Sequence, residues 1–217
     1  MTDLASYFDH TTLKPDTNLD QVNQLCREAV EFGFASVCLP PFFVKKGVQF
    51  LKDNKVRTST VIGFPMGYST TAAKVEEIKR AIDEGASEVD VVINICAVKS
   101  GEWNFVSHDI ERMIAATHIK GKVIKVILET CLLEEKELVK LIGICNDLQP
   151  DFVKTSTGFN GAGANLEIIA QLRSLLNKKI KVKASGGIRD RATAEALIRA
   201  GAARLGSSSS VLIVKDL

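Results

Sequence analysis

The chain has 217 residues, of which 46% are hydrophobic and 25% charged, and its formal net charge of +2 comes without any basic block. This is the composition of an ordinary globular protein, and it argues against a nucleic-acid footprint or a polybasic membrane patch. The five cysteines are scattered without CxxC spacing, the N-terminus lacks a signal-peptide pattern, and glycines, a proline and hydroxyls interrupt the longest uncharged stretch, so we expect a cytoplasmic protein.

Apolar runs that end in glycine or proline alternate with segments of helical spacing along the whole chain. The expected strands cover residues 9–13, 36–39, 58–64, 88–94, 123–129, 152–157, 181–185 and 204–207. A helical pattern follows each strand, and the last one covers residues 208–217. Eight strand–helix units with nearly continuous apolar strands predict one (β/α)₈ TIM barrel, a single catalytic domain over residues 1–217. The alternative, an open doubly wound sheet, lacks a GxGxxG pattern after the first strand.

Lys154 is the most unusual residue, because it lies inside the apolar run Phe152-Val153-Lys154-Thr155. Burying an ammonium is costly, so a lysine in a buried strand calls for an explanation. One explanation is chemical, since a lysine kept partly neutral is a nucleophile at neutral pH. The other is a strand-end lysine whose ammonium reaches back to water.

Other polar residues lie in the other strands, and in a barrel of this type the active site forms at the carboxyl ends of the strands. The candidates are Asp9, Cys38, Asp90, Lys125, Lys154 and Lys183. We interpret the charged ones as a catalytic ion network; a structural network is the alternative. Lys183 near Lys154 would disfavour the charged form of whichever amine is less well paired, and Asp90 could hold an ammonium and relay protons. Cys38 has no evident base and fits a small buried side chain.

Two loops rich in glycine and serine follow the last two strands, where barrels often bind phosphate. They contain Gly186 and Gly187 after the seventh strand, and Gly206, Ser208 and Ser209 at the eighth. Glycine lets the backbone approach an anion, and serine hydroxyls and free amides donate to it. Thr157 and Gly158, after the sixth strand, would form a third wall. No metal is expected, because the three histidines lack a second ligand at metal-binding spacing.

Four motifs resemble those of the deoxyribose-phosphate aldolase family: DHTTLK at residues 9–14, EVDVVIN at 88–94, FVKTSTGF at 152–159 and VKASGGIR at 182–189. The resemblance implies that Lys154 forms a Schiff base and that Asp90 and Lys183 donate and accept protons. It implies reversible cleavage of 2-deoxy-D-ribose 5-phosphate to glyceraldehyde 3-phosphate and acetaldehyde, in deoxyribonucleotide catabolism. Metal and organic cofactors are not expected, the substrate would be a phosphorylated sugar or aldehyde, and the chain would form a homodimer or homotetramer.

The chain departs from the family pattern at a few positions. Cys96 stands where the family usually has glycine, and Ser207 and Ser210 replace smaller residues. Phe159 replaces a basic residue that some members carry, which would remove one phosphate contact. No C-terminal tyrosine is present.

Two other functions fit the same residues. A catalytically silent phosphate-binding barrel would use its lysines only in structural ion pairs. An isomerase on a phosphate-binding barrel would use Asp90 as a base and form no covalent adduct.

Overall fold

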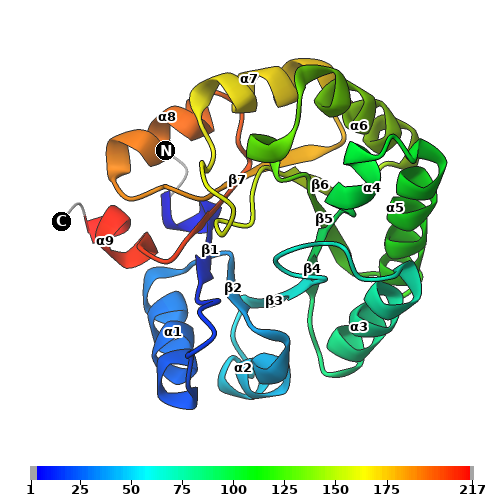
Figure 1. Cartoon of the computed structure of the whole chain (residues 1–217). Coiled ribbons are helices and arrows are strands. Elements are labelled where there is room, and N and C mark those ends of the chain that lie inside the picture. The colour runs from blue at the N-terminus through cyan, green and yellow to red at the C-terminus, as the bar shows by residue number, and fades with distance from the viewer. Residues whose placement is uncertain (1–3, 216–217) are drawn as a thin grey trace.

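A computed structural model describes residues 4–215, and its strands close into a barrel (Figure 1). All neighbouring strands run parallel, each strand pairs with the next in the chain, and β8 pairs with β1. The strands are β1 (Phe8–Thr11), β2 (Ser36–Leu39), β3 (Arg57–Ile62), β4 (Glu88–Val92), β5 (Val123–Ile127), β6 (Phe152–Lys154), β7 (Lys181–Ser185) and β8 (Arg204–Ser207). The predicted (β/α)₈ TIM barrel is confirmed.

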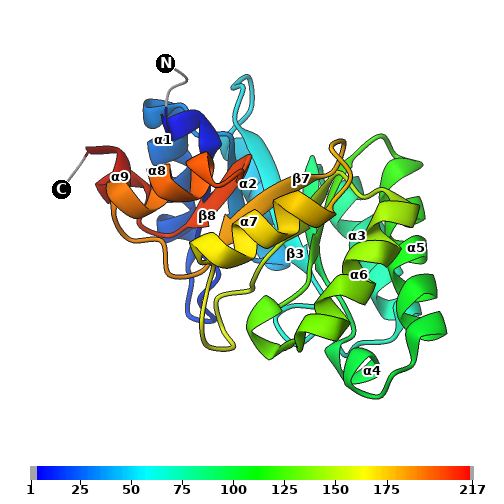
Figure 2. The same cartoon turned by 90° about the horizontal axis from the view of Figure 1, so that it is seen from above.

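Helices surround this ring, and Figure 2 shows α8, α7 and α6 side by side along one flank. The α-helices are α1 (Leu19–Phe32), α2 (Val44–Phe50), α3 (Thr71–Asp83), α4 (Ile95–Lys99), α5 (Trp103–His118), α6 (Glu135–Leu148), α7 (Leu166–Leu175), α8 (Arg191–Arg199) and α9 (Ser210–Lys215). Short 3₁₀ helices are η1 (Leu4–Tyr7), η2 (Pro41–Phe43) and η3 (Thr130–Leu132). Within residues 4–215, no helix combines the length and the apolar character needed to cross a membrane.

Local sequence accounts for these elements. In β4 the alternate residues Val89 and Val91 are fully buried, while Glu88 and Asp90 share the opposite face of the strand. Helix α1 begins at a capping box in which the side chains of Asn18 and Gln21 bond each other's backbone N–H groups. The barrel therefore has an apolar outer layer against the helices and a polar interior.

Several predicted strands run too far toward their carboxyl ends. The structure ends β4 at Val92 rather than residue 94, β5 at Ile127 rather than 129, and β6 at Lys154 rather than 157. β1 and β3 likewise end two residues early. The ladder continues for one more bond, as from Thr155 N–H to the Lys183 carbonyl at 3.1 Å, and then the chain turns into the loops over the barrel mouth. Helix α9 begins at Ser210, two residues later than predicted, and its predicted end at residues 216–217 lies outside the described part of the chain.

Candidate active site

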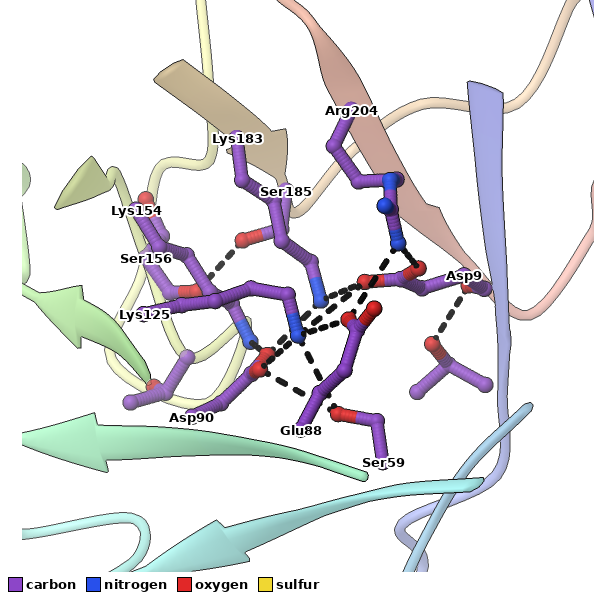
Figure 3. A network of polar contacts seen from close by, with 12 residues as sticks. Asp9, Ser59, Glu88, Asp90, Lys125, Lys154, Ser156, Lys183, Ser185 and Arg204 are labelled. Carbon is purple, nitrogen blue, oxygen red and sulfur yellow. Dashed lines mark hydrogen bonds and ion pairs between the residues drawn. The ribbon is translucent and has the colours of Figure 1, made fainter. Parts of the chain in front are cut away.

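A network of charged side chains fills the barrel interior, and Asp90 lies at its centre (Figure 3). The Nζ atoms of Lys154 and Lys183 donate to Asp90 Oδ2 at 2.8 and 2.7 Å. Lys125 Nζ donates to Asp90 Oδ1 at 2.8 Å. The strand register explains this convergence, because Asp90 pairs with Lys125 and Lys154 pairs with Lys183, and paired residues point to the same side of a sheet.

A second half of the network lies around Asp9 and Glu88. Asp9 forms ion pairs with Lys183 and Arg204, both at 2.5 Å, and accepts a hydrogen bond from Ser36 at 2.6 Å. Glu88 pairs with Lys125 at 2.6 Å, with Arg204 at 3.3 Å and with the largely exposed Arg57 at 3.0 Å. All three carboxylates are fully buried, so their charges depend on these partners.

The charges in this network do not balance if every group is ionised. Three buried carboxylates face four buried or nearly buried cations, namely Lys125, Lys154, Lys183 and Arg204. The ammonium of Lys154 is the least stabilised of these cations, because it contacts one carboxylate whereas that of Lys183 contacts two. A neutral Lys154 would leave three buried cations against three carboxylates, besides the largely exposed Arg57 that pairs with Glu88.

The two facing lysines differ in the direction of their pKa shifts. Burial lowers the pKa of Lys154 below the usual 10.5; the Lys183 charge adds to this effect and the Asp90 carboxylate only partly opposes it. Burial also acts on Lys183, but the carboxylates of Asp9 and Asp90 outweigh it and raise the Lys183 pKa. Lys154 is therefore the lysine that is easier to deprotonate, and Lys183 stays protonated at neutral pH.

The remaining members of the network are held in their charged forms. Burial opposes ionisation of Asp90, yet Lys125, Lys154 and Lys183 together keep its pKa well below the usual 3.8. The pKa of Lys125 is raised despite burial, by Asp90, Glu88 and Asp9. Asp90 is thus a carboxylate that returns any proton readily to a neighbour.

A cavity of about 270 Å³ opens above the network at the carboxyl ends of the strands. Of the three buried lysines inside the barrel, Lys154 alone lines it, whereas Lys125 and Lys183 do not. The cavity wall includes all the residues predicted for phosphate, which are Thr157, Gly158, Gly186, Gly187, Gly206, Ser208 and Ser209. A deprotonated lysine at the base of such a cavity can add to a carbonyl, with a proton donor and an acceptor within reach.

Some hydrogen-bond donors of the predicted phosphate loops already bond other groups within the protein. Ser209 N–H donates to Ser207 Oγ at 3.0 Å, and Ser207 Oγ donates to the Ile188 carbonyl at 2.8 Å. Within residues 4–215, the N–H groups of Gly187 and Ser208 have no hydrogen-bond partner, so both are free to donate to an anion, as are those of Gly158 and Gly186. The serine at 207 therefore ties the two Gly/Ser loops together.

Other predicted residues take varied positions. Cys38 is buried beside the network, where burial raises the pKa of its thiol to about 11. Phe159 lines the cavity and packs edge-to-face against Phe64, with ring centroids 5.3 Å apart. Cys96 is exposed on α4 and does not line this cavity. His10 is buried and hydrogen-bonds Glu28 at 2.8 Å.

Four charged residues at or beside the network were not predicted from the sequence, and one of them is Arg57, which pairs with Glu88 from the start of β3. Glu88 lies two residues before Asp90 on the same strand face, so strand alternation alone could have identified it. Arg204 begins β8 and reaches inward to Asp9 and Glu88. Glu129 follows β5 as a buried carboxylate. Apart from the Cys131 thiol at 4.0 Å, its hydrogen-bond partners are 28 and 31 residues away in the chain, so no local pattern indicates them.

Comparisons with known proteins show which family the chain belongs to. A family model described as DeoC/LacD family aldolase matches residues 4–209. A deoxyribose-phosphate aldolase of Thermococcus gammatolerans is 44% identical over 98% of this chain and 96% of its own, and one of Mannheimia succiniciproducens is 46% identical over 99% and 95%. The tetrameric deoxyribose phosphate aldolase from Aeropyrum pernix superposes with a TM-score of 0.91 at 34% identity, covering 98% of this chain and 89% of that one. The chain therefore belongs to the DeoC/LacD family of aldolases.

Proposed function

We propose that this chain is a class I aldolase that reversibly cleaves 2-deoxy-D-ribose 5-phosphate to glyceraldehyde 3-phosphate and acetaldehyde. The observation that carries the proposal is the position of Lys154: its amine, with a lowered pKa, lies between the charged network and a cavity walled by Gly/Ser loops. The names of the relatives support the substrate.

In the proposed reaction the Lys154 amine adds to the C1 aldehyde of the open-chain sugar, and loss of water gives a protonated imine. Removal of the C3 hydroxyl proton then breaks the C2–C3 bond. Its electron pair moves toward the imine nitrogen to form an enamine, and glyceraldehyde 3-phosphate leaves. Protonation of the enamine carbon and hydrolysis of the imine release acetaldehyde and restore the amine.

Asp90 and Lys183 are the proposed proton carriers. Lys183 stays protonated at neutral pH because Asp9 and Asp90 raise its pKa, so it can donate to the departing hydroxyl when the imine forms. Asp90 touches both lysines through one oxygen and can pass a proton between them, directly or through water. Lys125 and Asp9 would act indirectly, by keeping Asp90 and Lys183 charged.

The phosphate of the substrate would sit against the loops after β7 and β8, on the free N–H groups of Gly187 and Ser208. Gly186, Gly206 and Ser209 would complete this wall, and Thr157 and Gly158 would close it from the β6 side.

Borohydride reduction in the presence of acetaldehyde tests the proposal. The reduced imine leaves an N-ethyl group on the lysine, and we expect peptide mass mapping to locate it at Lys154. Lys154→Met should abolish trapping. Absence of an adduct would contradict the mechanism and favour the isomerase or the silent barrel. An adduct at another residue would show that Lys154 is not the nucleophile.

We further propose that the active protein is a cytoplasmic homodimer or homotetramer built from one catalytic domain. The tetramer described for the Aeropyrum pernix protein supports self-association. Light scattering coupled to size-exclusion chromatography would give the mass of the assembly directly.

A further inference from the structure

Glu129 is a buried carboxylate that the proposed mechanism does not use. It follows β5, is 1% exposed, and forms no ion pair with any residue in the range 4–215. Its backbone has φ 55° and ψ 60°, the left-handed region that residues other than glycine seldom adopt. A buried carboxyl group on a strained backbone persists only where the surrounding structure holds it in place, and such positions cluster at functional sites.

The carboxylate of Glu129 holds the loop that follows β6. Its Oε1 accepts a hydrogen bond from Thr157 N–H at 3.1 Å, and its Oε2 accepts from the Thr157 hydroxyl and from Asn160 Nδ2, the latter at 2.9 Å. Phe159 N–H in turn donates to Thr157 Oγ1 at 3.1 Å. One side chain thus fixes both ends of the segment 157–160, which begins three residues after Lys154.

That segment leads into glycines in close contact with the turn after β7. A Cβ atom built on Gly163 would lie 2.0 Å from the Gly186 carbonyl oxygen, and the Cα of Gly158 lies 3.6 Å from a Cβ built on Gly186. Ala164 N–H also donates to the carbonyls of Ser185 and Gly186, at 3.0 and 3.2 Å. Gly186 and Gly187 form part of the cavity wall to which we assign the phosphate.

Glu129 does not itself line the cavity, so its influence on a ligand passes through this loop. The donors it binds already occupy its oxygens, and no cation within residues 4–215 forms an ion pair with them. The side chain of Glu129 therefore fixes the position in which the loop after β6 packs against the Gly186–Gly187 turn.

We propose that Glu129 is a positioning residue that holds the β6–α7 loop against the Gly186–Gly187 turn and so sets the affinity for the phosphate of the substrate. This inference rests on the proposed aldolase function. It distinguishes Glu129 from Asp90 and Lys183, whose loss would affect the covalent steps with any substrate.

The test compares 2-deoxyribose 5-phosphate with 2-deoxyribose in Glu129→Gln. Glutamine keeps the shape but presents an amide N–H₂ where the carboxylate accepts, so the bonds to Thr157 and Asn160 cannot all be kept. We expect KM for the phosphorylated sugar to rise about tenfold or more while kcat stays within about threefold, and kcat/KM for 2-deoxyribose to change less than about threefold. Glu135→Gln, an exposed change on α6, is the matched control and should leave all constants unchanged.

A parallel loss of kcat/KM with both sugars would overturn the inference, as would an unchanged KM. If Glu129→Gln does not fold, Asn160→Ala removes a single donor to the carboxylate and should raise KM for the phosphorylated sugar in the same direction; no rise would also overturn it. A wild-type protein without retro-aldol activity would refute the proposed function instead. The role of Glu129 could then be tested with inorganic phosphate alone. We expect phosphate to raise the Tm of the wild type and not that of Glu129→Gln, and an equal rise in both would overturn the inference.

Discussion

Replacing Lys154 or Lys183 by methionine should have unequal consequences for stability, although the two lysines are partners in the strand register. Lys183 lies 2.5 Å from Asp9 Oδ2 and 2.7 Å from Asp90 Oδ2, and without it Asp9 keeps Arg204 on Oδ1 and Lys125 at 3.7 Å from Oδ2. Removing one partner of a buried ion pair costs about 3–5 kcal/mol. For a chain of this size that corresponds to a fall in Tm of about 6–20 °C.

Lys154→Met removes the surplus cation instead. Asp90 keeps Lys125 at 2.8 Å and Lys183 at 2.7 Å, and methionine fills most of the space that the lysine stem occupied. We expect the free energy of unfolding to stay within about 1 kcal/mol of wild type or to increase, because a buried cation has been taken away. The matching Tm change is at most about 4 °C downward.

The pH dependence has a definite sign for each lysine. The Lys154 pKa is lower in the folded protein than the usual 10.5, so its charge destabilises the fold at neutral pH, and any advantage of Lys154→Met should shrink as pH rises toward 10.5. The Lys183 pKa is raised, so its stabilisation is fully present below 10.5 and is lost only as pH rises through the folded value.

Thermal and urea unfolding followed by circular dichroism would measure both variants at pH 7, beside Lys178→Met as an exposed control. Equal losses in Lys154→Met and Lys183→Met would show that Lys154 is a fully paired cation, and our assignment of the charge imbalance would be wrong.

Three further predictions concern other parts of the site and the barrel. Gly206→Ala would place a Cβ 3.2 Å from Lys183 Cε and 3.1 Å from Ser185 Cβ. We therefore expect kcat for the retro-aldol reaction to fall about tenfold or more, with a stability loss of about 1 kcal/mol. A fully active variant would show that catalysis does not need Lys183 in a strict position. Lys74→Met would leave Asp109 buried without its 2.8 Å partner and should cost about 3–5 kcal/mol in urea unfolding, a loss that an exposed pair such as Lys79–Glu76 would not show. Alkylation with iodoacetamide at pH 8, followed by mass spectrometry, should modify Cys96 and Cys131 and spare Cys38. The thiol of Cys38 is buried and its pKa is raised to about 11. Alkylation of Cys38 as early as that of Cys96 would contradict its burial.

The sequence predicted the barrel and the meeting of Asp90, Lys154 and Lys183 for the same physical reason. Parallel strands buried on both faces must be apolar, so a charged residue inside such a run is conspicuous, and strand alternation tells which charges share a face. Glu88 obeys the same rule, and alternation would have placed it in the network beside Asp90.

The parts that sequence could not supply depend on contacts between distant segments. Which lysine carries the surplus charge follows from the number of carboxylates that each contacts, and this is set by side-chain reach within the barrel. The position of Glu129 depends on a left-handed backbone conformation that no local sequence pattern predicts, and on hydrogen bonds from the loop after β6, such as that from Thr157 N–H. The extent of strands β4 to β6 was overpredicted because apolar and β-branched residues continue past the ladder into the loops.

The sharing of carboxylates among cations within the barrel has a consequence for how this sequence can change. Asp9 and Glu88 each serve two or more cations, and Lys125 contacts all three carboxylates. Substitutions at two such positions cannot be additive, because the loss of a cation makes its orphaned carboxylate costly and the simultaneous loss of that carboxylate removes the cost. Accepted replacements in the interior should therefore arise as compensating pairs of opposite charge, which makes the network as a whole, more than any one of its residues, the unit on which selection acts.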